Sequence, residues 1–333
     1  MIKIKIAVVY NTSKSKQTKE VENNLFDMAK SVSKALAQNG HIVSLVNADD
    51  NLILNLNKEK PDFVFNMAER FNGNPNFTPH VAGLLEMNNI HFTGASSYGF
   101  LSCDNKLIAK LLMQHHGINT PKFQVFESAS EKLNQTMNFP LIVKPSNAHD
   151  SIGITNDSVV NNKKELKLKV DYILEYLKQN AIVEEFINGR EFNVAVLGNN
   201  NPYTLPICEV DFSKNSKRVL GYEMKWFINW YKEAPILCPA NISKPVQEKL
   251  KQISIAVHKK LGLRDYSRID FRLDNADTLY VLEVNANPGL TEDCFIYHAA
   301  KVAGIDYNAL ISRILHHATE RYKPSVAVEF NEK

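Results

Sequence analysis

Glycine is scarce in this chain, with 13 among 333 residues, and its spacing excludes two common nucleotide-binding motifs. No two glycines stand two positions apart, so the G-x-G-x-x-G loop of dinucleotide-binding domains is absent. The one pair with P-loop spacing, Gly94 and Gly99, is followed by Phe100 where a P-loop has lysine. A nucleotide that binds here must therefore be held by another device.

Cysteine is also rare and widely spaced, which excludes the common cysteine frameworks. The chain has four cysteines, which form no C-x-x-C pair: Cys103, Cys208, Cys238 and Cys294. We therefore expect neither a disulfide scaffold nor a structural zinc site, and we predict reduced thiols in a cytoplasmic protein. The N-terminus lacks the apolar core of a signal peptide, and no apolar run approaches the ~20 residues of a membrane helix. No membrane partner is expected.

An excess of charge of one sign is missing as well. Thirty-nine Lys and Arg residues stand against 36 Asp and Glu residues, so the formal net charge is only +3. This charge does not favour a nucleic acid as partner. Hydrophobic residues make up 44% and charged residues 23%, which is typical of a folded globular protein. The length of 333 residues exceeds one ordinary core, so we expect two or three domains.

Strand and helix patterns alternate along three consecutive units. Residues 1–100 predict an α/β unit with a parallel sheet, 101–182 and 183–322 predict two further units, and 323–333 predict a tail. Strands are expected at 2–10, 42–46, 62–66, 91–93, 122–126, 140–143, 181–185, 191–197, 206–210, 267–273 and 279–285. Helices are expected at 20–38, 81–87, 104–116, 163–179, 244–261 and 307–321, and a long loop at 211–239.

The segment 266–285 carries the residues that best fit a metal site. Its two apolar runs are separated by four turn-forming residues, which predicts an antiparallel hairpin. Because strand side chains alternate between two faces, Asp270, Glu283 and Asn285 are expected on one face together with Arg268. Two carboxylates and an amide oxygen form a ligand set suited to Mg²⁺. The ordinary alternative is a solvated strand face with one ion pair.

Two lysines and an acidic connector fit contacts with a nucleotide. Lys144 ends an apolar strand beside a polar loop, and Lys106 lies in the first turn of a helix. Either one alone is typical of an ordinary surface lysine. The connector 183–191 is apolar, then acidic, then apolar, so its backbone could line an adenine while Glu191 lies near a ribose. The alternative for this connector is a hairpin with exposed acidic residues.

These residues occur in the order found in the ATP-grasp ligases, and the chain resembles the D-alanine–D-alanine ligase branch of that superfamily. The resemblance is strong over about residues 100–320 and holds only in outline over the first hundred residues. The segments that carry it are 143–146, 151–154, 222–225, 238–240, 268–270 and 283–291. It implies an ATP-grasp fold of the α/β class with an N-terminal parallel-sheet domain. It also implies a ligase that joins a carboxylate to an amine through an acylphosphate intermediate, with ATP and two Mg²⁺ as cofactors and Mn²⁺ as an alternative metal.

The same resemblance implies roles for individual residues. Phosphates, adenine and ribose would be bound by Lys106, Lys144, Ser151, Glu184, Glu185, Phe186, Ile187 and Glu191. The metal ligands would be Asp270, Glu283 and Asn285, and the catalytic residues would be Arg268, Lys225 and Asp150. The substrate-binding residues would be Trp226, Gly289 and Cys294. The partners would be small carboxylates and amines, and the assembly a homodimer.

The departures from the family pattern cluster where the family binds amino acids. Residues 10–14 replace a glycine-rich turn that contains a serine and a glutamate, and Glu20 or Glu22 could supply that glutamate. Residues 69–74 retain little of the family's His-Gly…Gly-Glu-Asp-Gly loop. Three single positions also differ: Asp150 replaces a serine, Trp226 a tyrosine and Cys294 a serine.

We therefore expect the ATP and metal side of the family's site to be retained and the amino acid side to be altered. The leading hypothesis is an ATP-dependent ligase of the D-alanine–D-alanine ligase type. The alternatives are an ATP-grasp ligase for a different amino acid or metabolite carboxylate, and a relative that binds ATP without catalysis.

Overall fold

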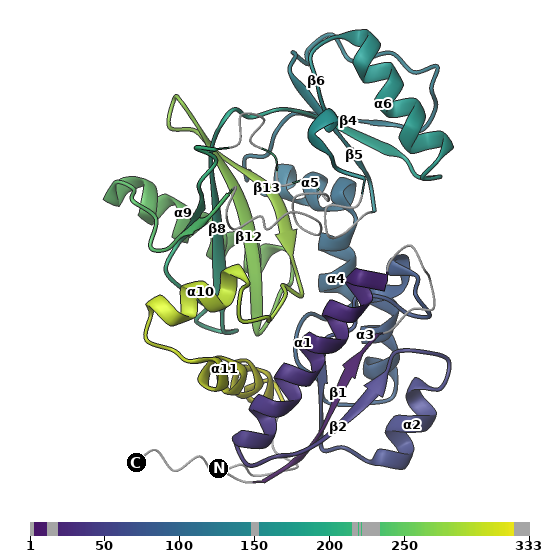
Figure 1. Ribbon diagram of the computed structural model, residues 1–333, viewed down its shortest axis with the longest axis vertical. Coiled ribbons are helices and arrows are strands. Elements are labelled where there is room, and N and C mark those ends of the chain that lie inside the picture. Colours follow the sequence, from purple (N-terminus) through teal and green to yellow (C-terminus); the bar gives the residue numbers. More distant parts are fainter. Residues whose placement is uncertain are drawn as a thin grey trace.

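The computed structural model describes residues 3–11, 19–147, 153–214, 219, 221 and 234–322. They form three sheets with helices packed around them (Figure 1). The predicted tail, 323–333, lies outside the described residues. Among the described helices, none combines the length and the apolar character that crossing a membrane requires.

The N-terminal unit is a three-stranded parallel sheet in the order β2-β1-β3. Its strands are β1 (Lys5–Tyr10), β2 (Ile42–Asn47) and β3 (Phe63–Asn66), and its helices are α1 (Lys19–Gln38), α2 (Leu52–Glu59), η2 (Pro75–Phe77) and α3 (Thr78–Met87). Helix α1 places Leu25, Met28, Val32 and Leu36 on one buried face, at the spacing of three and four residues that an amphipathic helix requires. The helix ends before Gly40, whose φ of +92° favours glycine.

A second sheet of four antiparallel strands has its own hydrophobic core. Its order is β4-β7-β5-β6, and it consists of β4 (Phe123–Phe126), β5 (Leu141–Pro145), β6 (Val159–Val160) and β7 (Ala181–Glu185) with η3 (Asn156–Ser158) and helix α6 (Lys163–Glu175). Strand β7 crosses the predicted boundary at 182/183 and pairs with β4 and β5. We therefore propose that this boundary lies after Glu185.

The third sheet has six strands and carries most of the candidate site. Its path is β11-β10-β8-β12-β13, with β9 paired to β8. The strands are β8 (Gly189–Leu197), β9 (Tyr203–Thr204), β10 (Cys208–Val210), β11 (Ile236–Leu237), β12 (Tyr266–Asp274) and β13 (Leu279–Asn285). The helices of this unit are α9 (Lys244–Lys260), α10 (Phe295–Val302) and α11 (Tyr307–Glu320).

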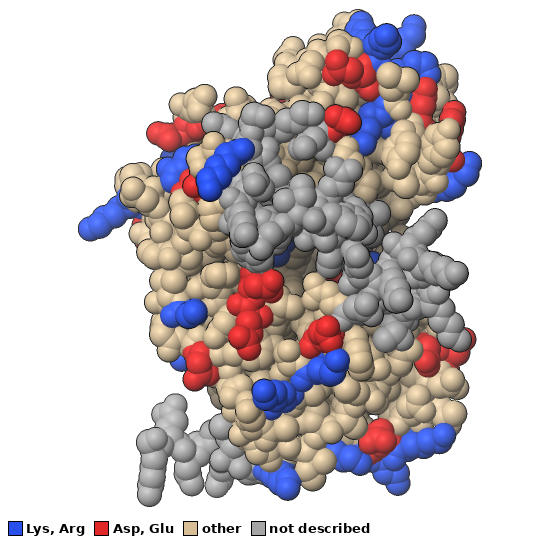
Figure 2. All heavy atoms as spheres, in the orientation of Figure 1, with Lys and Arg blue, Asp and Glu red and all other residues tan. Residues whose placement is uncertain are grey.

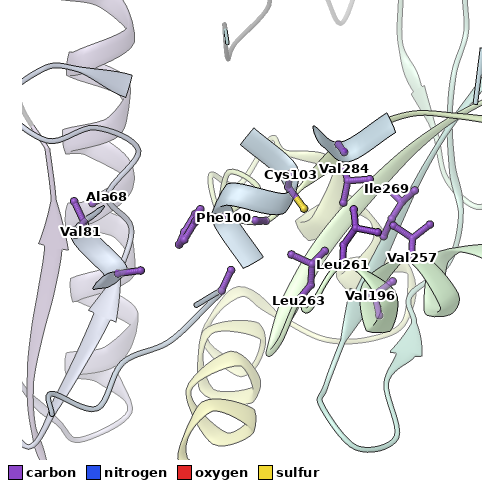
Figure 3. Packing of buried hydrophobic residues seen from close by; sticks show 14 of the residues in the cluster. Ala68, Val81, Phe100, Cys103, Val196, Val257, Leu261, Leu263, Ile269 and Val284 are labelled. Carbon is purple, nitrogen blue, oxygen red and sulfur yellow. The ribbon is translucent and has the colours of Figure 1, made fainter. Parts of the chain in front are cut away.

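Two helices connect the first unit to the rest, α4 (Ser97–Asp104) and α5 (Lys106–His115). Phe100 and Cys103 of α4 lie in one hydrophobic cluster with Ile269 and Val284 of the six-stranded sheet and Val257 of α9 (Figure 3). Helices α4 and α5 also contact β13. These two helices therefore pack against the six-stranded sheet.

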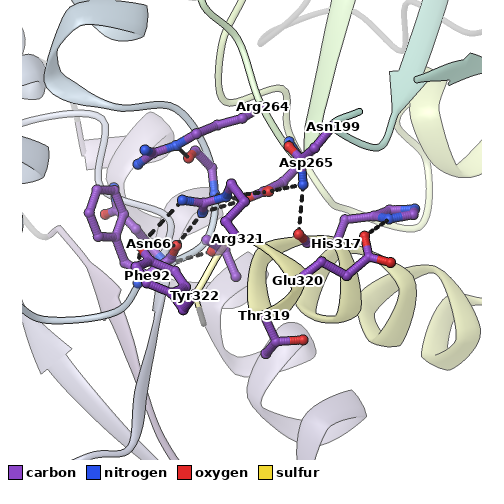
Figure 4. A network of polar contacts seen from close by, with 12 residues as sticks. Asn66, Phe92, Asn199, Arg264, Asp265, His317, Thr319, Glu320, Arg321 and Tyr322 are labelled. Atoms are coloured by element: carbon purple, nitrogen blue, oxygen red, sulfur yellow. Dashed lines mark hydrogen bonds and ion pairs between the residues drawn. The ribbon is translucent and has the colours of Figure 1, made fainter. Parts of the chain in front are cut away.

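The C-terminal helix returns to the N-terminal unit, where α11 lies beside α1 (Figure 1). A polar network then joins this helix end to both units (Figure 4). The Arg321 guanidinium donates to both carboxylate oxygens of Asp265 at 2.8 Å and to the carbonyl of Phe92 at 2.6 Å. The backbone amide of Gly94 donates to Asp265 at 2.7 Å. The N-terminal sheet and the six-stranded sheet are thereby held in one arrangement.

Most expected elements are present, and among the α-helices of the described residues three were not predicted by the sequence analysis: α2, α4 and α10. Each is eight residues long, which gives a helical pattern little length in which to repeat. The strand predicted at 91–93 is wrong, because Phe92 makes only an isolated bridge to Val64. The loop predicted at 211–239 contains the short strand β11.

Candidate active site

Strands β12 and β13 form the expected hairpin and bring four polar residues to one face. Asp270 lies directly opposite Glu283, and Arg268 lies opposite Asn285. The register shifts after Asp270, so that Phe271 pairs with Val281. The alternation of side chains thus holds for the polar end of the hairpin and is broken by a bulge beyond it.

Asp270 is the centre of a dense set of hydrogen bonds on this face. The Arg268 guanidinium donates to both of its carboxylate oxygens, at 2.8 and 2.9 Å. The side-chain amides of Asn193 and Asn285 donate to the same oxygens at 2.6 and 3.1 Å. Burial opposes the charge of Arg268, but Asp270 and Glu283 together with Cys294 outweigh burial and raise the pKa of Arg268.

The second carboxylate of the hairpin contacts the start of α5. The Lys106 ammonium lies 3.1 Å from Glu283, and Lys106 is the first residue of α5, after the N-cap Asn105. Asp104 lies one residue before that cap. Burial raises the pKa of Asp104 to about 7, with Lys106 acting against this shift and Glu283 adding to it. One oxygen of Asp104, Oδ2, is buried and accepts no hydrogen bond from the described residues.

A buried carboxylate lies between two lysines where the four-stranded sheet meets α5. The Glu184 side chain is 1% exposed, and its Oε2 lies 3.1 Å from Lys144 and 3.2 Å from Lys110. Burial favours the neutral form of Glu184, but the two ammonium groups outweigh it and hold its pKa below the ordinary value. Burial lowers the pKa of Lys110 to about 8. The other oxygen, Glu184 Oε1, is buried without a hydrogen-bond partner among the described residues.

The connector between β7 and β8 is fixed by Arg272 of β12. The Arg272 guanidinium lies 2.8 Å from the Glu191 carboxylate and donates to the carbonyls of Ile187 and Gly189 at 3.4 and 3.2 Å. Gly189 is required here, because a Cβ atom would stand 1.9 Å from the carbonyl oxygen of Leu273. The acidic connector is therefore anchored by charge and by close backbone packing, and is not an exposed hairpin.

Two pockets meet at Arg268 and Glu283, which line both of them. The first pocket lies between the four-stranded and six-stranded sheets, and its lining includes Lys144, Glu184, Phe186, Ile187, Glu191 and Asp270. The second lies toward the N-terminal unit, and its lining includes Glu69, Thr78, Asp104, Asn287 and Gly289. A chemical group transferred from one pocket to the other would therefore move past Arg268 and Glu283.

The donors and acceptors of the first pocket fit a nucleotide and a divalent metal. Two buried oxygens of residues that line this pocket lack hydrogen-bond donors among the described residues: Glu184 Oε1 and Asn193 Oδ1. In the described part of the chain, no three His, Cys, Asp or Glu side chains cluster at metal-binding distance. The oxygen set here is two carboxylates with neighbouring amides, which suits a metal that keeps waters and shares phosphate oxygens, as Mg²⁺ does. In this structure Arg268 is paired with the Asp270 carboxylate, and Lys106 is paired with the Glu283 carboxylate.

Of the remaining predicted site residues, three lie in the described part of the chain and four lie outside it. Gly289 lines the second pocket, and Cys294 is the N-cap residue of α10, where burial raises its pKa to about 11. Glu185 lines the first pocket at the end of β7. The predicted residues Asp150, Ser151, Lys225 and Trp226 lie outside the described residues.

Sequence analysis missed Lys110, Arg272, Asn193, Glu69 and Asp104. Lys110 follows Lys106 by one helical turn, so the helix prediction could have placed both on one face. Arg272 follows Asp270 by two residues on the same strand, and period-two alternation could have placed it on the site face. No local pattern marks the other three residues, because they reach the pockets through tertiary packing.

On the face of the molecule shown in Figure 2, basic and acidic groups are scattered among uncharged side chains. The described residues on this face form no continuous basic stripe.

Comparison with known proteins gives consistent matches. The family model of the D-ala D-ala ligase C-terminus matches residues 112–316. The uncharacterized protein y4sG of Sinorhizobium fredii is 35% identical over 303 residues, which covers 89% of this chain and 88% of that protein. The D-alanine–D-alanine ligase of Aquifex aeolicus is 36% identical over 289 residues, which covers 86% of this chain and 92% of that protein.

Solved structures match the fold over nearly the whole chain. The ATP complex of D-alanine–D-alanine ligase from Bacillus anthracis superposes with a TM-score of 0.75 at 21% identity, covering 96% of this chain and 98% of that one. The VanG D-Ala:D-Ser ligase from Enterococcus faecalis superposes with a TM-score of 0.74 at 22% identity, covering 95% of this chain and 100% of that one. All three sheets therefore belong to one known architecture.

Proposed function

The chain belongs to the D-alanine–D-alanine ligase family and is an ATP-dependent ligase with the ATP-grasp fold, and from this premise we propose that it joins a small amino acid to an amine where the two pockets meet. The observation that carries this proposal is the pair Arg268 and Glu283, which line both pockets. A γ-phosphate in the first pocket and a carboxylate in the second would both lie within reach of this pair. The reaction needs that contact, because a carboxylate must be phosphorylated before an amine can attack it.

The ATP side of the proposal rests on the first pocket. The backbone of Phe186 and Ile187 would bind the adenine edge. Glu184 Oε1, which has no donor among the described residues, would accept a hydrogen bond from an adenine amino group. Glu191, held by Arg272, would accept hydrogen bonds from ribose hydroxyls. Lys144 would supply positive charge to the phosphates, and the resemblance assigns Ser151 and Lys225 to the same phosphates.

Asp270, Glu283 and Asn285 would hold Mg²⁺, which supplies positive charge to the phosphate oxygens when bound. Lys106 would turn from Glu283 toward the phosphates once a metal neutralises that carboxylate. Arg268 would stabilise the negative charge that develops on the reacting carboxylate oxygen. We propose Asp150 as a further acidic group at this centre, from the resemblance alone.

The amino acid side of the proposal rests on the second pocket. Asp104 Oδ2 has no donor among the described residues, and Glu69 lines the same pocket. A substrate ammonium would donate to Asp104 Oδ2 and lower the raised pKa of that carboxyl, so these two acidic groups favour a substrate that carries an ammonium group. Gly289 and Cys294 would lie near the carboxylate of the acceptor, and the resemblance assigns Trp226 to substrate binding.

An alternative keeps the same ligase activity but changes the substrate. Glu69 stands in the loop where the family has His-Gly, so the first amino acid of this enzyme can differ from D-alanine. The enzyme would then be a ligase of the same type for another amino acid or metabolite carboxylate. The homodimer and the cytoplasmic location are further proposals. The second is supported by four free thiols, which are usual in a reducing compartment.

The test is ADP release from Mg·ATP with single and paired amino acids, D-alanine included, with the product identified by mass. The proposal expects ADP release that depends on an amino acid pair, together with a product whose mass equals the two substrates minus water. It is contradicted if the protein binds Mg·ATP in calorimetry and no pair in a broad panel releases ADP. Light scattering of the same preparation would test the homodimer.

A further inference from the structure

Two cysteines that are 30 residues apart in sequence lie side by side in the six-stranded sheet. Strands β10 and β11 pair Glu209 with Leu237 and Val210 with Ile236, and continuing this register by one residue places Cys208, the first residue of β10, opposite Cys238, which directly follows β11. Their sulfur atoms are 3.1 Å apart, and both are free thiols. A disulfide bond of about 2.05 Å requires these sulfurs to approach by only about 1 Å.

The backbone holds this pair on both sides. Before Cys238, strand β11 pairs with β10, and the amide of Asp211 donates to the carbonyl of Pro235 at 2.9 Å. After Cys238, the amide of Ala240 donates to the carbonyl of Ile207 at 2.8 Å. Opposed residues of adjacent antiparallel strands have the Cα separation that a disulfide needs. The backbone therefore holds the two cysteines side by side before any bond forms.

The two thiols differ in reactivity. Cys208 is 1% exposed, whereas Cys238 is partly exposed. The Cys208 thiol donates its hydrogen to the Cys238 sulfur, which lowers the pKa of Cys238 against the opposing effect of burial. The same hydrogen bond raises the pKa of Cys208, and burial adds to this. Cys238 is therefore the accessible nucleophile, and Cys208 is placed to react with it in a second step.

We propose that Cys238 and Cys208 are a peroxide-sensitive thiol pair that closes to an intramolecular disulfide next to the candidate active site. The Cys238 thiol loses its proton, the thiolate attacks one oxygen of a hydroperoxide, and the O–O bond breaks; the departing hydroxide or alkoxide takes up a proton in place of the one the thiol lost and leaves as water or an alcohol, and Cys238 becomes a sulfenic acid. The Cys208 sulfur then attacks the Cys238 sulfur, the S–O bond breaks, and the departing hydroxide takes the Cys208 proton and leaves as water. Two thiols lose two electrons, and the peroxide gains them.

A short path links this pair to the site. The Cys208 thiol also contacts the carbonyl of Phe295 at 3.6 Å, and Phe295 is the first residue of α10. The guanidinium of Arg268 lies 5.4 Å from the centre of the Phe295 ring. A disulfide draws the Cys208 sulfur toward Cys238 and away from the carbonyl of Phe295. The support of Arg268 changes as a result, so we expect slower turnover; this last step rests on the proposed function.

The experiment treats the full chain with hydrogen peroxide, alkylates the remaining thiols after unfolding, and maps the peptides by mass. We expect a mass loss of two hydrogen atoms and a Cys208–Cys238 linkage, with Cys103 and Cys294 alkylated. In Cys208→Ser, dimedone should trap the sulfenic acid of Cys238, whereas Cys238→Ser should show neither product. Cys103→Ala is the matched control, because its thiol is buried elsewhere, and it should oxidise as the parent does.

The proposal is overturned if Cys238 stays fully alkylated under conditions that oxidise a reference peptide with a free cysteine, or if other cysteines react first. ADP release should fall by about fivefold or more on oxidation, at the lower end of couplings between separate sites. Dithiothreitol should restore it, and Cys238→Ser should be insensitive to peroxide. A disulfide that forms without changing turnover would overturn the link to Arg268. A reduced protein that never releases ADP would instead contradict the proposed function, and the peptide map would still decide the thiol pair.

Discussion

The two pockets of this protein differ in how their side chains are held. In the first pocket, charged side chains are fixed in pairs: Arg268 with Asp270, Arg272 with Glu191 and Glu184 with two lysines. Both pockets contain buried oxygens without a donor among the described residues, but two lysines hold the pKa of Glu184 in the first pocket below its ordinary value, whereas burial raises the pKa of Asp104 in the second to about 7. The first set is preorganised for a constant ligand such as ATP. The second pocket offers a carboxyl group whose negative charge a cationic ligand must still stabilise.

This difference matches the distribution of family features along the chain. The first pocket is built from the segments that resemble the family most closely, between about residues 100 and 320. The second takes Glu69 and Thr78 from the N-terminal unit, where the resemblance is weakest. We infer that the ATP half of the reaction is shared with the family and that substrate choice resides in the N-terminal unit and α4. The predictions below test this division, from the largest expected effect to the smallest.

The largest effect is expected from Asp270→Asn. The change removes a charge from the proposed metal site and the bidentate partner of Arg268, so ADP release should fall by about 10³-fold. Asp277→Asn in the exposed β12–β13 turn is the matched control and should retain turnover. Steady-state ADP release measures both. Equal turnover in the two variants would remove the hairpin from the reaction.

Gly189→Ala tests whether the connector is fixed by its backbone. A Cβ atom at Gly189 would stand 1.9 Å from the carbonyl oxygen of Leu273, so the free energy of unfolding should fall by about 3 kcal/mol or more. The control is Gly83→Ala in α3, where the nearest atom would be 3.7 Å away. That variant should gain about 0.5–1 kcal/mol, because alanine suits a helix better than glycine. Urea unfolding measures both, and similar stabilities would contradict the account of the connector.

The pH dependence of the free energy of unfolding tests the burial of His258 against the six-stranded sheet. Burial lowers the pKa of His258 to about 4, and its ring contacts Ser267 and the carbonyl of Gly198. The unfolded chain therefore binds this proton below about pH 6.5 and the folded chain does not, so stability is lost as pH falls from about 6.5 toward 4. The loss from this residue is about 3 kcal/mol. In His258→Gln the slope of stability against pH should be flatter over this range, whereas exposed His80→Gln should follow the parent curve.

The smallest effect is expected in the second pocket, and it should change KM for one substrate only. Glu69→Gln removes one negative charge that lines the pocket, so KM for the ammonium-bearing substrate should rise by about tenfold, which corresponds to ~1.4 kcal/mol. KM for ATP should stay unchanged, because Glu69 does not line the first pocket. Asp27→Asn on the exposed face of α1 is the control and should change neither constant. An equal rise in both KM values would contradict the division between the pockets.

Sequence analysis predicted most of the features that follow from a regular pattern of apolar and polar residues. The hairpin of β12 and β13 and its polar face followed from two apolar runs and a four-residue turn. The bulge after Asp270 was not predicted, because no residue type marks it. The helices α2, α4 and α10 were missed because eight residues complete only about two helical turns.

The partners of the predicted charges were harder to foresee than the charges themselves. Glu184 was predicted as a nucleotide contact, but its burial between Lys110 and Lys144 depends on the packing of α5 against two sheets. The proximity of Cys208 and Cys238 likewise depends on the pairing of β10 with β11, a strand of two residues inside an expected loop. Contacts between residues distant in sequence leave no periodic signal.

The most direct test of the division between the pockets is hydrogen exchange of the full chain with and without Mg·ATP. We predict slower exchange in the connector from β7 to β8 and along β12 and β13, with the N-terminal sheet unchanged until an amino acid is added. Protection that first appears in the N-terminal sheet, with none in the connector, would contradict it.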